Sequence, residues 1–417
     1  MTNLSQHDRW LWRTTLVFLL FIAFSRIGYP SCRHPHLTII ADRDQLITTD
    51  IQQAIDSCGK VGGGIVRFPA GKYISGTIEL KSNVTLIFEK DAVLTGSDKY
   101  SDYRNDAFIF GKDLTGIRIE GSGIIDGVDC YNPNGEEGFR GPHCIKLINC
   151  KTIVLKQFTI RNSANWAVNC RYCSNAEITG VTIKGGHDGI HTRFCSGFVI
   201  SDCDIRTGDD AFAGNDNSNF IVSGCKINSS CNGFRMGCMN LKVLHCTIWG
   251  PGEYMHKIQK RNNMLSAFVH FSPKDENPKQ KSGNWIIKDV VIRGADNIYI
   301  YNFENGLWQT GQPVTNVTCE NLIATDILNS FNITGDSAKL FNLQIKHSSF
   351  SYRQDQSGNK HLYEGQKFLS PALFNISKFN KLELIDVQIN NNGENPLFSC
   401  QSGNLVIVRD VILKTGN

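Results

Sequence analysis

The stretch of sequence with the most functional chemistry runs from residue 185 to residue 215 and reads GGHDGIHTRFCSGFVISDCDIRTGDDAFAGN. It carries Asp188, Asp209 and Asp210 in glycine-containing segments, with separations of 21 and 22 residues from the first aspartate to the other two. Clustered carboxylates can exchange protons with a bound molecule or bind a cation such as calcium. Carboxylates this far apart in sequence meet only if the chain repeats its path with a similar period.

A repeat with that period surrounds the three aspartates. Five aligned segments end at isoleucines separated by 23, 22, 22 and 21 residues, and apolar residues alternate with polar ones within each segment. Alternation is typical of strands with one buried face, and a period near 22 without matching helical patterns is typical of a solenoid. The repeat therefore predicts an all-β fold, a single-stranded right-handed parallel β-helix. Its five closing residues are Ile160, Ile183, Ile205, Ile227 and Ile248.

Segments on either side of the repeat extend the same domain. TTDIQQAIDSC (Thr48–Cys58) has the apolar spacing of a short helix with Thr or Asp caps, and we expect it to cover the open end of the first coil. Residues 251–283 and 349–371 are rich in Lys, Asn, Ser and Pro, which predicts loop insertions. Since no linker divides the chain, residues 33–417 are interpreted as a single β-helix domain.

The 15 cysteines follow the same register, which favours a packing role. Cys150, Cys173, Cys195 and Cys238 form one column, in which Asn217 occupies the remaining position. Buried thiols behave as small apolar groups, so the columns are interpreted as core ladders. Disulfides within CRYC (Cys170 and Cys173) or at Cys231 are the alternative.

Register also places the carboxylates. Asp188, Asp210, Asn232 and Glu253 each follow a closing isoleucine by five residues and so share one column, beside which Asp209 supplies a third carboxylate. Parallel strands lie about 4.8 Å apart, so Asp188 and Asp210 are predicted to be neighbours. Stacked like charges raise at least one pKa and cost free energy, which favours catalysis over a solvated turn or a calcium site.

The same residues resemble a known family. GHDG around Asp188, TGDD around Asp209 and Asp210, and CNGFRMG around Asn232 resemble the motifs of glycoside hydrolase family 28, the polygalacturonase and rhamnogalacturonase group, over roughly residues 46–330. The resemblance implies a pectin-lyase-like solenoid and an inverting hydrolase without cofactor or metal. It implies that Asp209 is the general acid and that Asp188 and Asp210 hold and deprotonate the attacking water.

Two departures from the family motifs bear on the substrate. The family histidine is replaced by Asn232, and the family Arg-Ile-Lys motif is replaced by NNMLSAFVHFSP (Asn262–Pro273). We therefore expect an acidic or decorated polysaccharide of the pectin type, with exo action if the 251–283 insertion closes the cleft. His143 and Trp166 are expected near the same cleft. The candidate substrate-binding residues are Asn232, Arg235, His191, Arg193, His187, Glu253 and His270.

Two other functions remain open on sequence grounds. One is a non-catalytic glycan-binding β-helix, and the other is a polysaccharide lyase or epimerase that abstracts a proton beside a uronate carboxylate. A net charge of +4 without a Lys/Arg run gives no support to a nucleic-acid partner. The expected partner is a polysaccharide or oligosaccharide, and the expected state is a monomer.

The N-terminus predicts export. Arg9 and Arg13 precede the apolar run TTLVFLLFIAF (Thr14–Phe24), which has the length of a secretory signal rather than of a membrane span. Residues 1–32 are interpreted as a signal peptide or as a lipoprotein signal and anchor, with Cys32 as the site of lipid attachment in the second case. The predicted location is secreted, periplasmic or at the cell surface, including an outer-membrane lipoprotein, with membrane attachment only through this segment.

Overall fold

The computed structural model describes residues 34–41, 45–303, 308–329, 331–353, 372–391 and 396–415. The predicted signal segment, residues 1–32, lies outside the described residues, as does most of the predicted loop at 349–371. Within the described residues, no helix combines the length and apolar character needed to cross a membrane.

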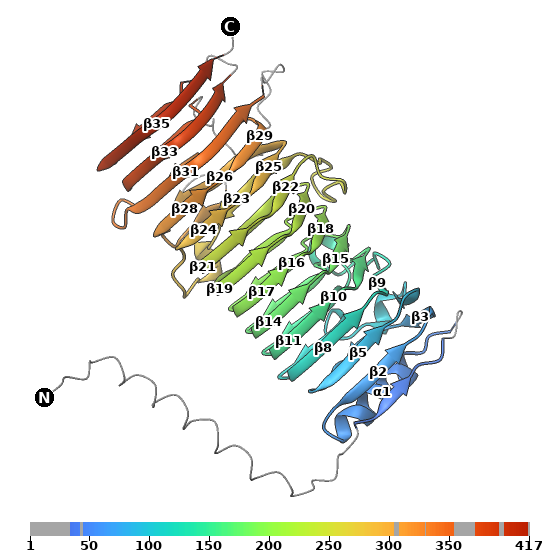
Figure 1. Cartoon of the computed structure of the whole chain (residues 1–417). Coiled ribbons are helices and arrows are strands. Elements are labelled where there is room, and N and C mark those ends of the chain that lie inside the picture. Colours follow the sequence, from blue (N-terminus) through green and yellow to red (C-terminus); the bar gives the residue numbers. More distant parts are fainter. Residues whose placement is uncertain are drawn as a thin grey trace, which may run out of the picture.

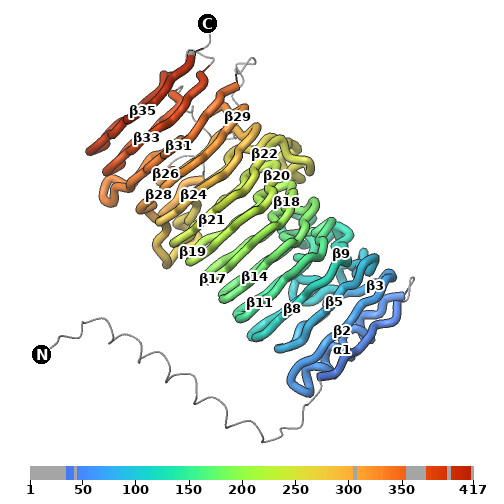
Figure 2. Tube along the Cα trace, viewed as in Figure 1, coloured from blue at the N-terminus to red at the C-terminus, as the bar shows by residue number. Residues whose placement is uncertain are grey.

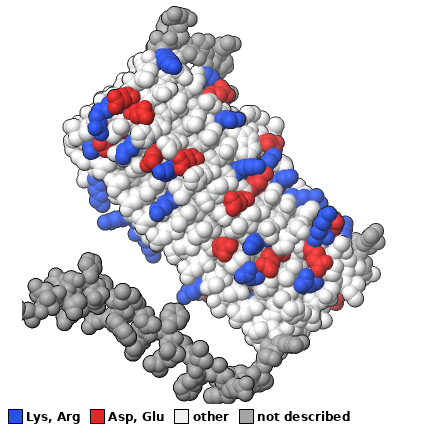
Figure 3. Space-filling view, in the orientation of Figure 1, with Lys and Arg blue, Asp and Glu red and all other residues white. Residues whose placement is uncertain are grey.

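The chain winds into the predicted right-handed parallel β-helix (Figures 1 and 2). Successive coils stack along one axis from the blue N-terminal end to the red C-terminal end, and the strand ladders form three parallel sheets. On the face shown in Figure 3, acidic and basic side chains are interspersed. The single-domain interpretation of residues 33–417 stays a prediction.

Strands of the three sheets alternate along the chain. The first sheet contains β1 (His36–Thr38), β2 (Gly64–Phe68), β5 (Val84–Phe88), β8 (Thr115–Gly121), β11 (Lys151–Lys156), β14 (Ser174–Thr179), β17 (Ser196–Ser201), β24 (Trp285–Lys288) and β28 (Asn316–Glu320). The second contains β3 (Gly71–Ser75), β6 (Ala92–Gly96), β9 (Ile124–Asp126), β12 (Thr159–Arg161), β15 (Thr182–Lys184), β18 (Asp204–Thr207), β20 (Lys226–Ser229), β22 (Thr247–Trp249), β25 (Val291–Arg293) and β29 (Ile323–Ile327).

The third sheet follows the turns in which the candidate site lies. It contains β4 (Ile78–Glu79), β7 (Ala107–Lys112), β10 (His143–Ile148), β13 (Val168–Arg171), β16 (Ile190–Arg193), β23 (Met264–His270), β26 (Ala295–Phe303), β27 (Gln309–Thr310), β30 (Phe331–Thr334), β32 (Phe374–Ser377) and β34 (Phe398–Gln401). Long strands continue from one sheet into the next: β19 (Phe212–Ser223), β21 (Asn232–Leu244), β31 (Phe341–Tyr352), β33 (Phe379–Asn391) and β35 (Leu405–Thr415). Short 3-10 helices occur at η1 (Tyr100–Asp102), η2 (Glu136–Gly138) and η3 (Lys274–Glu276).

The predicted register is confirmed through the central coils. Ile160 pairs with Ile183, and the pairing continues through Ile205 and Ile227 to Ile248. All five side chains are buried, because each coil covers its apolar residues only with the coils above and below. The cysteines of the described residues are free thiols, and all except Cys400 are buried, which confirms the ladder interpretation over disulfides.

The predicted N-terminal helix is α1 (Thr48–Lys60), and it packs on β2, β4 and β5 at the start of the stack. Ile51, Ile55 and Cys58 form its buried face. The predicted Thr or Asp cap is wrong, because Ile47 is the N-cap and makes no side-chain cap hydrogen bond. The Thr48 hydroxyl instead accepts a hydrogen bond of 2.8 Å from the backbone N–H of Gly76 and so ties the helix to the adjoining coil.

The predicted loop at 251–283 contains a buried strand, which corrects the expectation of one continuous insertion. β23 pairs with β21 and continues the third sheet, with Asn232 opposite Ser266. Glu253 therefore does not follow Asn232 in the carboxylate column. The extra chain forms one loop before β23, at 250–263, and another after it, at 271–284.

A stacked turn elsewhere in the helix shows which residue type this chain uses for structure. Asn240 donates to Asn219 at 2.9 Å, Asn284 donates to Asn240 at 3.1 Å, and the same contact continues through later coils. Amides can stack in this way because each offers both a donor and an acceptor. Stacked carboxylates lack donors, so the aspartate column requires another explanation.

Candidate active site

The three aspartates lie in the turns that lead from the second sheet to the third. Asp188 lies between β15 and β16, and Asp209 and Asp210 lie between β18 and β19. The backbone N–H of Gly189 donates to the carbonyl of Asp210 at 2.9 Å, and that of Ala211 donates to the carbonyl of Asn232 at 2.9 Å. These contacts confirm that Asp188, Asp210 and Asn232 occupy successive coils at the same position.

The three carboxylates are close together but differ in exposure. One oxygen of each lies within 4.8 Å of the others. The side chains of Asp188 and Asp210 are 3% and 1% exposed, whereas that of Asp209 is 19% exposed. Asp209 is thus the carboxyl that solvent, or a ligand replacing solvent, can reach. The carboxyls are closer than the roughly 6.5–9.5 Å typical of acid and base pairs in inverting glycosidases.

Neighbouring side chains hold the two buried carboxylates. Asp188 contacts Nδ1 of His191 at 2.8 Å through Oδ2, while its Oδ1 accepts from the backbone N–H of Asp210 at 3.3 Å. Asp210 accepts from Nδ2 of Asn232 at 2.7 Å and from Nε of Arg235. Arg235 therefore binds Asp210 through Nε, and its role in binding substrate stays a prediction.

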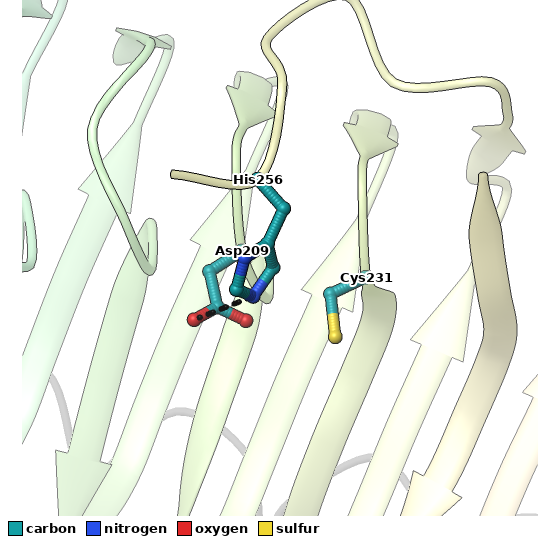
Figure 4. A group of neighbouring side chains, drawn as sticks. All are labelled: Asp209, Cys231 and His256. Carbon is teal, nitrogen blue, oxygen red and sulfur yellow. Dashed lines mark ion pairs between the residues drawn. The ribbon is translucent and has the colours of Figure 1, made fainter. Parts of the chain in front are cut away.

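Asp209 is contacted by a histidine from outside the repeat. Nε2 of His256 lies 3.5 Å from Oδ2 of Asp209. Figure 4 shows His256 reaching from the loop at 250–263 onto Asp209, with Cys231 on the neighbouring coil. The backbone of Asp209 is fixed by the hydroxyls of Thr207 and Ser229, which both donate to its carbonyl at 2.7 Å.

Hydrogen bonds within the loop determine which nitrogen of His256 carries the proton. Nδ1 accepts from the backbone N–H of Gln259 at 3.1 Å and from that of Ile258 at 3.3 Å. A nitrogen that accepts hydrogen bonds carries no proton, so Nε2 is the protonated nitrogen of the neutral ring. His256 therefore presents an N–H donor to Asp209.

Two loops roof the site. We call residues 127–142, between β9 and β10, the first roof loop, and residues 250–263, between β22 and β23, the second roof loop. Nζ of Lys257 in the second loop pairs with Asp129 of the first. The second loop packs so closely on the turn of Asp209 that a Cβ at Gly208 would lie 2.9 Å from the carbonyl oxygen of Met255. Glycine is required there by that approach.

Burial and mutual repulsion set the protonation of the aspartates. Burial raises the pKa of Asp188 well above its ordinary value, and the charges of Asp209 and Asp210 raise it further. Burial also raises the pKa of Asp210, although Arg235 opposes it. Burial acts in the same direction on Asp209, but the His256 hydrogen bond and the charge of Arg235 outweigh it and leave that pKa below its ordinary value. The two buried carboxyls therefore hold a proton more readily than Asp209 does.

The donors around Asp209 favour protons over a cation. Ligand atoms of Asp209, Cys231 and His256 lie within 4.8 Å of one another, as metal ligands do. However, Nε2 of His256 carries a proton, and burial raises the pKa of the Cys231 thiol well above its ordinary value. Arg235 already compensates charge in the aspartate group. His256 and Arg235 face carboxylates as donors, whereas the Cys231 sulfur accepts from Nδ2 of Asn232 and from Arg261.

Four other predicted substrate-binding residues are either paired with a charged neighbour or closed to solvent. Glu253 pairs with Arg206 at 2.8 Å, and Arg193 pairs with Glu276 at 3.1 Å. His270 is 0% exposed, with Nδ1 3.2 Å from the Ser282 hydroxyl and Nε2 3.3 Å from the Gln312 carbonyl.

His187, the fourth of these predicted substrate-binding residues, lies next to the first roof loop. It is 1% exposed, and its ring lies 5.6 Å from that of Phe139. Burial and the charge of Arg140 lower the pKa of His187 to about 3, so the ring is neutral.

His256 and Arg140 were missed by the sequence analysis. His256 contacts Asp209, and Arg140, 6% exposed, reaches Oδ1 of Asn165 at 3.4 Å on the coil before Asp188. Both belong to the roof loops, where the 22-residue register does not apply. The only signal in the sequence was an isolated histidine in an insertion adjoining the motif from which a histidine is missing.

Comparison with known proteins supports the family resemblance. Residues 58–242 match the family model described as Glycosyl hydrolases family 28, which confirms the resemblance over the coils that carry the aspartates. A probable polygalacturonase of Vitis vinifera is 31% identical over 170 residues, an alignment that covers 34% of this chain and 35% of that protein. The chain thus spans about a third of the length of this curated relative.

Solved structures show the same fold over most of the chain. The family 28 exopolygalacturonase of Yersinia enterocolitica superposes with a TM-score of 0.60 at 16% identity, covering 91% of this chain and 78% of that one. A hyperthermoactive exopolygalacturonase of Thermotoga maritima gives a TM-score of 0.52 at 15% identity, covering 91% and 92%. At these identities the likeness establishes the β-helix fold.

Proposed function

We propose that the protein is an exported glycoside hydrolase that cleaves an acidic polysaccharide of the pectin type with water. The observation that carries the proposal is the group of three carboxyls on two successive coils, of which only Asp209 is open to solvent. The family match over residues 58–242 and the polygalacturonase relative support the reaction class. The protein is expected to act as a monomer.

In this proposal Asp209 is the general acid that protonates the glycosidic oxygen. Its exposure supports the role, since the acid must touch the bond that breaks. Without substrate, Asp188 and Asp210 hold a proton more readily than Asp209 does. A sugar that covers Asp209 removes solvent from its carboxylate and raises its pKa, so the shared proton moves to Asp209 when substrate is bound.

Asp188 and Asp210 are proposed to hold and deprotonate the attacking water. Their short separation from Asp209 resembles that of retaining glycosidases, in which a carboxylate attacks the sugar directly. Side chains only 3% and 1% exposed are poorly placed to reach an anomeric carbon, so the role proposed for them requires a water molecule bound between them and the sugar. Burial thus favours water as the nucleophile and inversion at the anomeric carbon.

His256 is proposed as a positioning residue for the acid, in place of the family histidine that Asn232 replaces. Its N–H faces Oδ2 of Asp209. As Asp209 loses its proton to the leaving oxygen, negative charge grows on the carboxylate and the hydrogen bond from His256 becomes stronger. An interaction that strengthens in the transition state lowers the barrier.

Digestion of a panel of polygalacturonate, rhamnogalacturonan and algal uronans tests the proposal. A hydrolase releases reducing ends with no ultraviolet-absorbing unsaturated product, and its rate is unchanged by a chelator. An unsaturated product whose formation stops on chelation would identify a lyase instead. Saturable binding to a glycan with no product would identify a binding protein.

A further inference from the structure

The outermost described strand of the stack, β35, leaves the end of the hydrophobic core exposed (Figure 1). Val406 and Val408 stack on Leu382 and Leu384, which are 0% exposed, yet they are themselves 46% and 48% exposed. Leu413, further along the strand, is 45% exposed. Among the described strands only β33 pairs with β35, so the other edge of β35 is open. An open edge lined by apolar residues is a template for pairing with another strand.

The two ends of the stack differ in how they are covered. At the other end, α1 packs on β2, β4 and β5 and buries Ile51, Ile55 and Cys58. At this end, β33 is the only described element that makes extensive contact with β35. A second copy stacked head to tail would therefore meet α1, whereas a second copy stacked tail to tail would meet an equally exposed core. The arrangement that covers both exposed cores is tail to tail.

The sequence of β35 is complementary to itself in the antiparallel direction. Residues 406–413 read VIVRDVIL, and each apolar residue before the central Arg409 and Asp410 has an apolar counterpart after them. The matched pairs are Val408 and Val411, Ile407 and Ile412, and Val406 and Leu413. Antiparallel pairing of two copies about this centre places every residue opposite its counterpart. Arg409 of each copy then lies opposite Asp410 of the partner subunit, so the charges also match.

The bend in β35 is compatible with a two-fold axis. Asp410 has a φ of 53°, in the left-handed region, and forms the corner between an arm in the first sheet, residues 405–409, and an arm in the second, residues 411–415. A two-fold axis along the bisector of this corner exchanges the two arms and reverses the direction of the stack. It also leaves inward-facing residues facing inward, so Val408 meets Val411 of the partner subunit within the core. A shift of one residue would place inward-facing residues opposite outward-facing ones.

We propose that two copies of the chain dimerise tail to tail through β35, whose strands pair antiparallel and join the two hydrophobic cores. Each copy uses the same surface, so the contact closes at two copies. The dimer does not depend on the proposed hydrolase function, because the candidate active site lies within a single chain. The monomer expected from the sequence is therefore the unit that acts on substrate, and the dimer is an assembly of two such units.

Sedimentation equilibrium of the full chain over a series of concentrations tests the dimer. We expect the wild type to show a monomer–dimer equilibrium without larger species. Arg409→Asp places an aspartate opposite Asp410 of the partner subunit twice in each dimer, and it should raise the dissociation constant at least ~10-fold. Arg293→Asp, on an exposed arginine of β25, makes the same change in net charge and is the matched control. It should leave the dissociation constant unchanged.

A second variant separates the pairing of charges from a loss of folding. Asp410→Arg places two arginines opposite each other and should weaken the dimer as Arg409→Asp does. In an equimolar mixture of the two variants, the introduced aspartate of one copy lies opposite the introduced arginine of the other, and the native pair also forms. We therefore expect the mixture to form heterodimers at least ~10-fold more tightly than either variant associates alone.

Three results would overturn the proposal. A wild type that stays monomeric at every concentration would mean that no second copy covers β35. Association that is unchanged in Arg409→Asp would place the contact on another surface. A mixture that associates no more tightly than either variant would show that Arg409 and Asp410 of two copies do not meet.

Discussion

Removing the N–H donor of His256 should weaken the acid without unfolding the protein. In His256→Phe the ring remains between the second roof loop and Asp209, but nothing donates to the carboxylate. A hydrogen bond to a charged group contributes roughly 1.5–3 kcal/mol, and the long 3.5 Å contact places the expected loss near the lower end of that range. About 1.4 kcal/mol corresponds to a tenfold fall in kcat. His256→Gln restores a side-chain N–H and should recover part of the rate.

The pH profile separates this role from a structural one. The His256 hydrogen bond lowers the pKa of Asp209, so its loss raises that pKa. Activity that requires a protonated Asp209 falls as pH rises through its pKa, so the basic limb of the kcat profile should move to higher pH in His256→Phe. His245→Gln is the control, because His245 makes a comparable 3.4 Å contact with Asp289 on the surface. An unchanged kcat and unchanged basic limb in His256→Phe would refute the reasoning.

Three further results are expected. Proton NMR of the first products should show inversion of the anomeric configuration, and net retention would mean that a carboxylate attacks the sugar directly. Arg235→Met should lower the unfolding free energy by ~3 kcal/mol in denaturant melts, because it leaves the buried Asp210 without its charged partner. Adding Asp210→Asn should restore part of the stability but no activity. An equal loss of stability in the double variant would count against this pairing. Burial lowers the pKa of His270 to about 3 from an ordinary 6.5. The contribution of the neutral ring to stability is therefore complete above pH 6.5 and is lost as pH falls toward 3. His270→Gln should reduce the slope of unfolding free energy against pH by about 1.4 kcal/mol per pH unit in that window, and an unchanged slope would argue against a neutral buried ring.

Repeat spacing predicted the parts of the molecule that obey it. The alternation and the 22-residue period fix which residues face inward and which coils are neighbours, because a shift of one residue would expose every buried side chain. The isoleucine column and the neighbouring positions of Asp188 and Asp210 follow from this alone. The family motifs then supplied roles that geometry leaves open.

Contacts outside the repeat were not predictable in the same way. Glu253 was placed by counting five residues from Ile248, but the chain leaves the register there to form the second roof loop. Its partner, Arg206, lies in an earlier coil at a separation that no period specifies. The contact between His256 and Asp209 likewise depends on how one loop folds back over a turn. Local preference also failed at Thr48, whose hydroxyl binds the next coil instead of capping its own helix.

The most direct test of the account is the rate of reducing-end release by Asp188→Asn, Asp209→Asn and Asp210→Asn, measured with a chelator on the substrate that the wild type cleaves. Asp202→Asn, in an exposed turn of the same coil as Asp209, is the matched control. The account predicts that each of the three variants loses at least ~100-fold in kcat, the lower end of what general acid–base catalysis contributes, while the control keeps wild-type activity. Retention of activity in Asp209→Asn would contradict the central claim that the exposed carboxyl of this cluster is the catalytic acid.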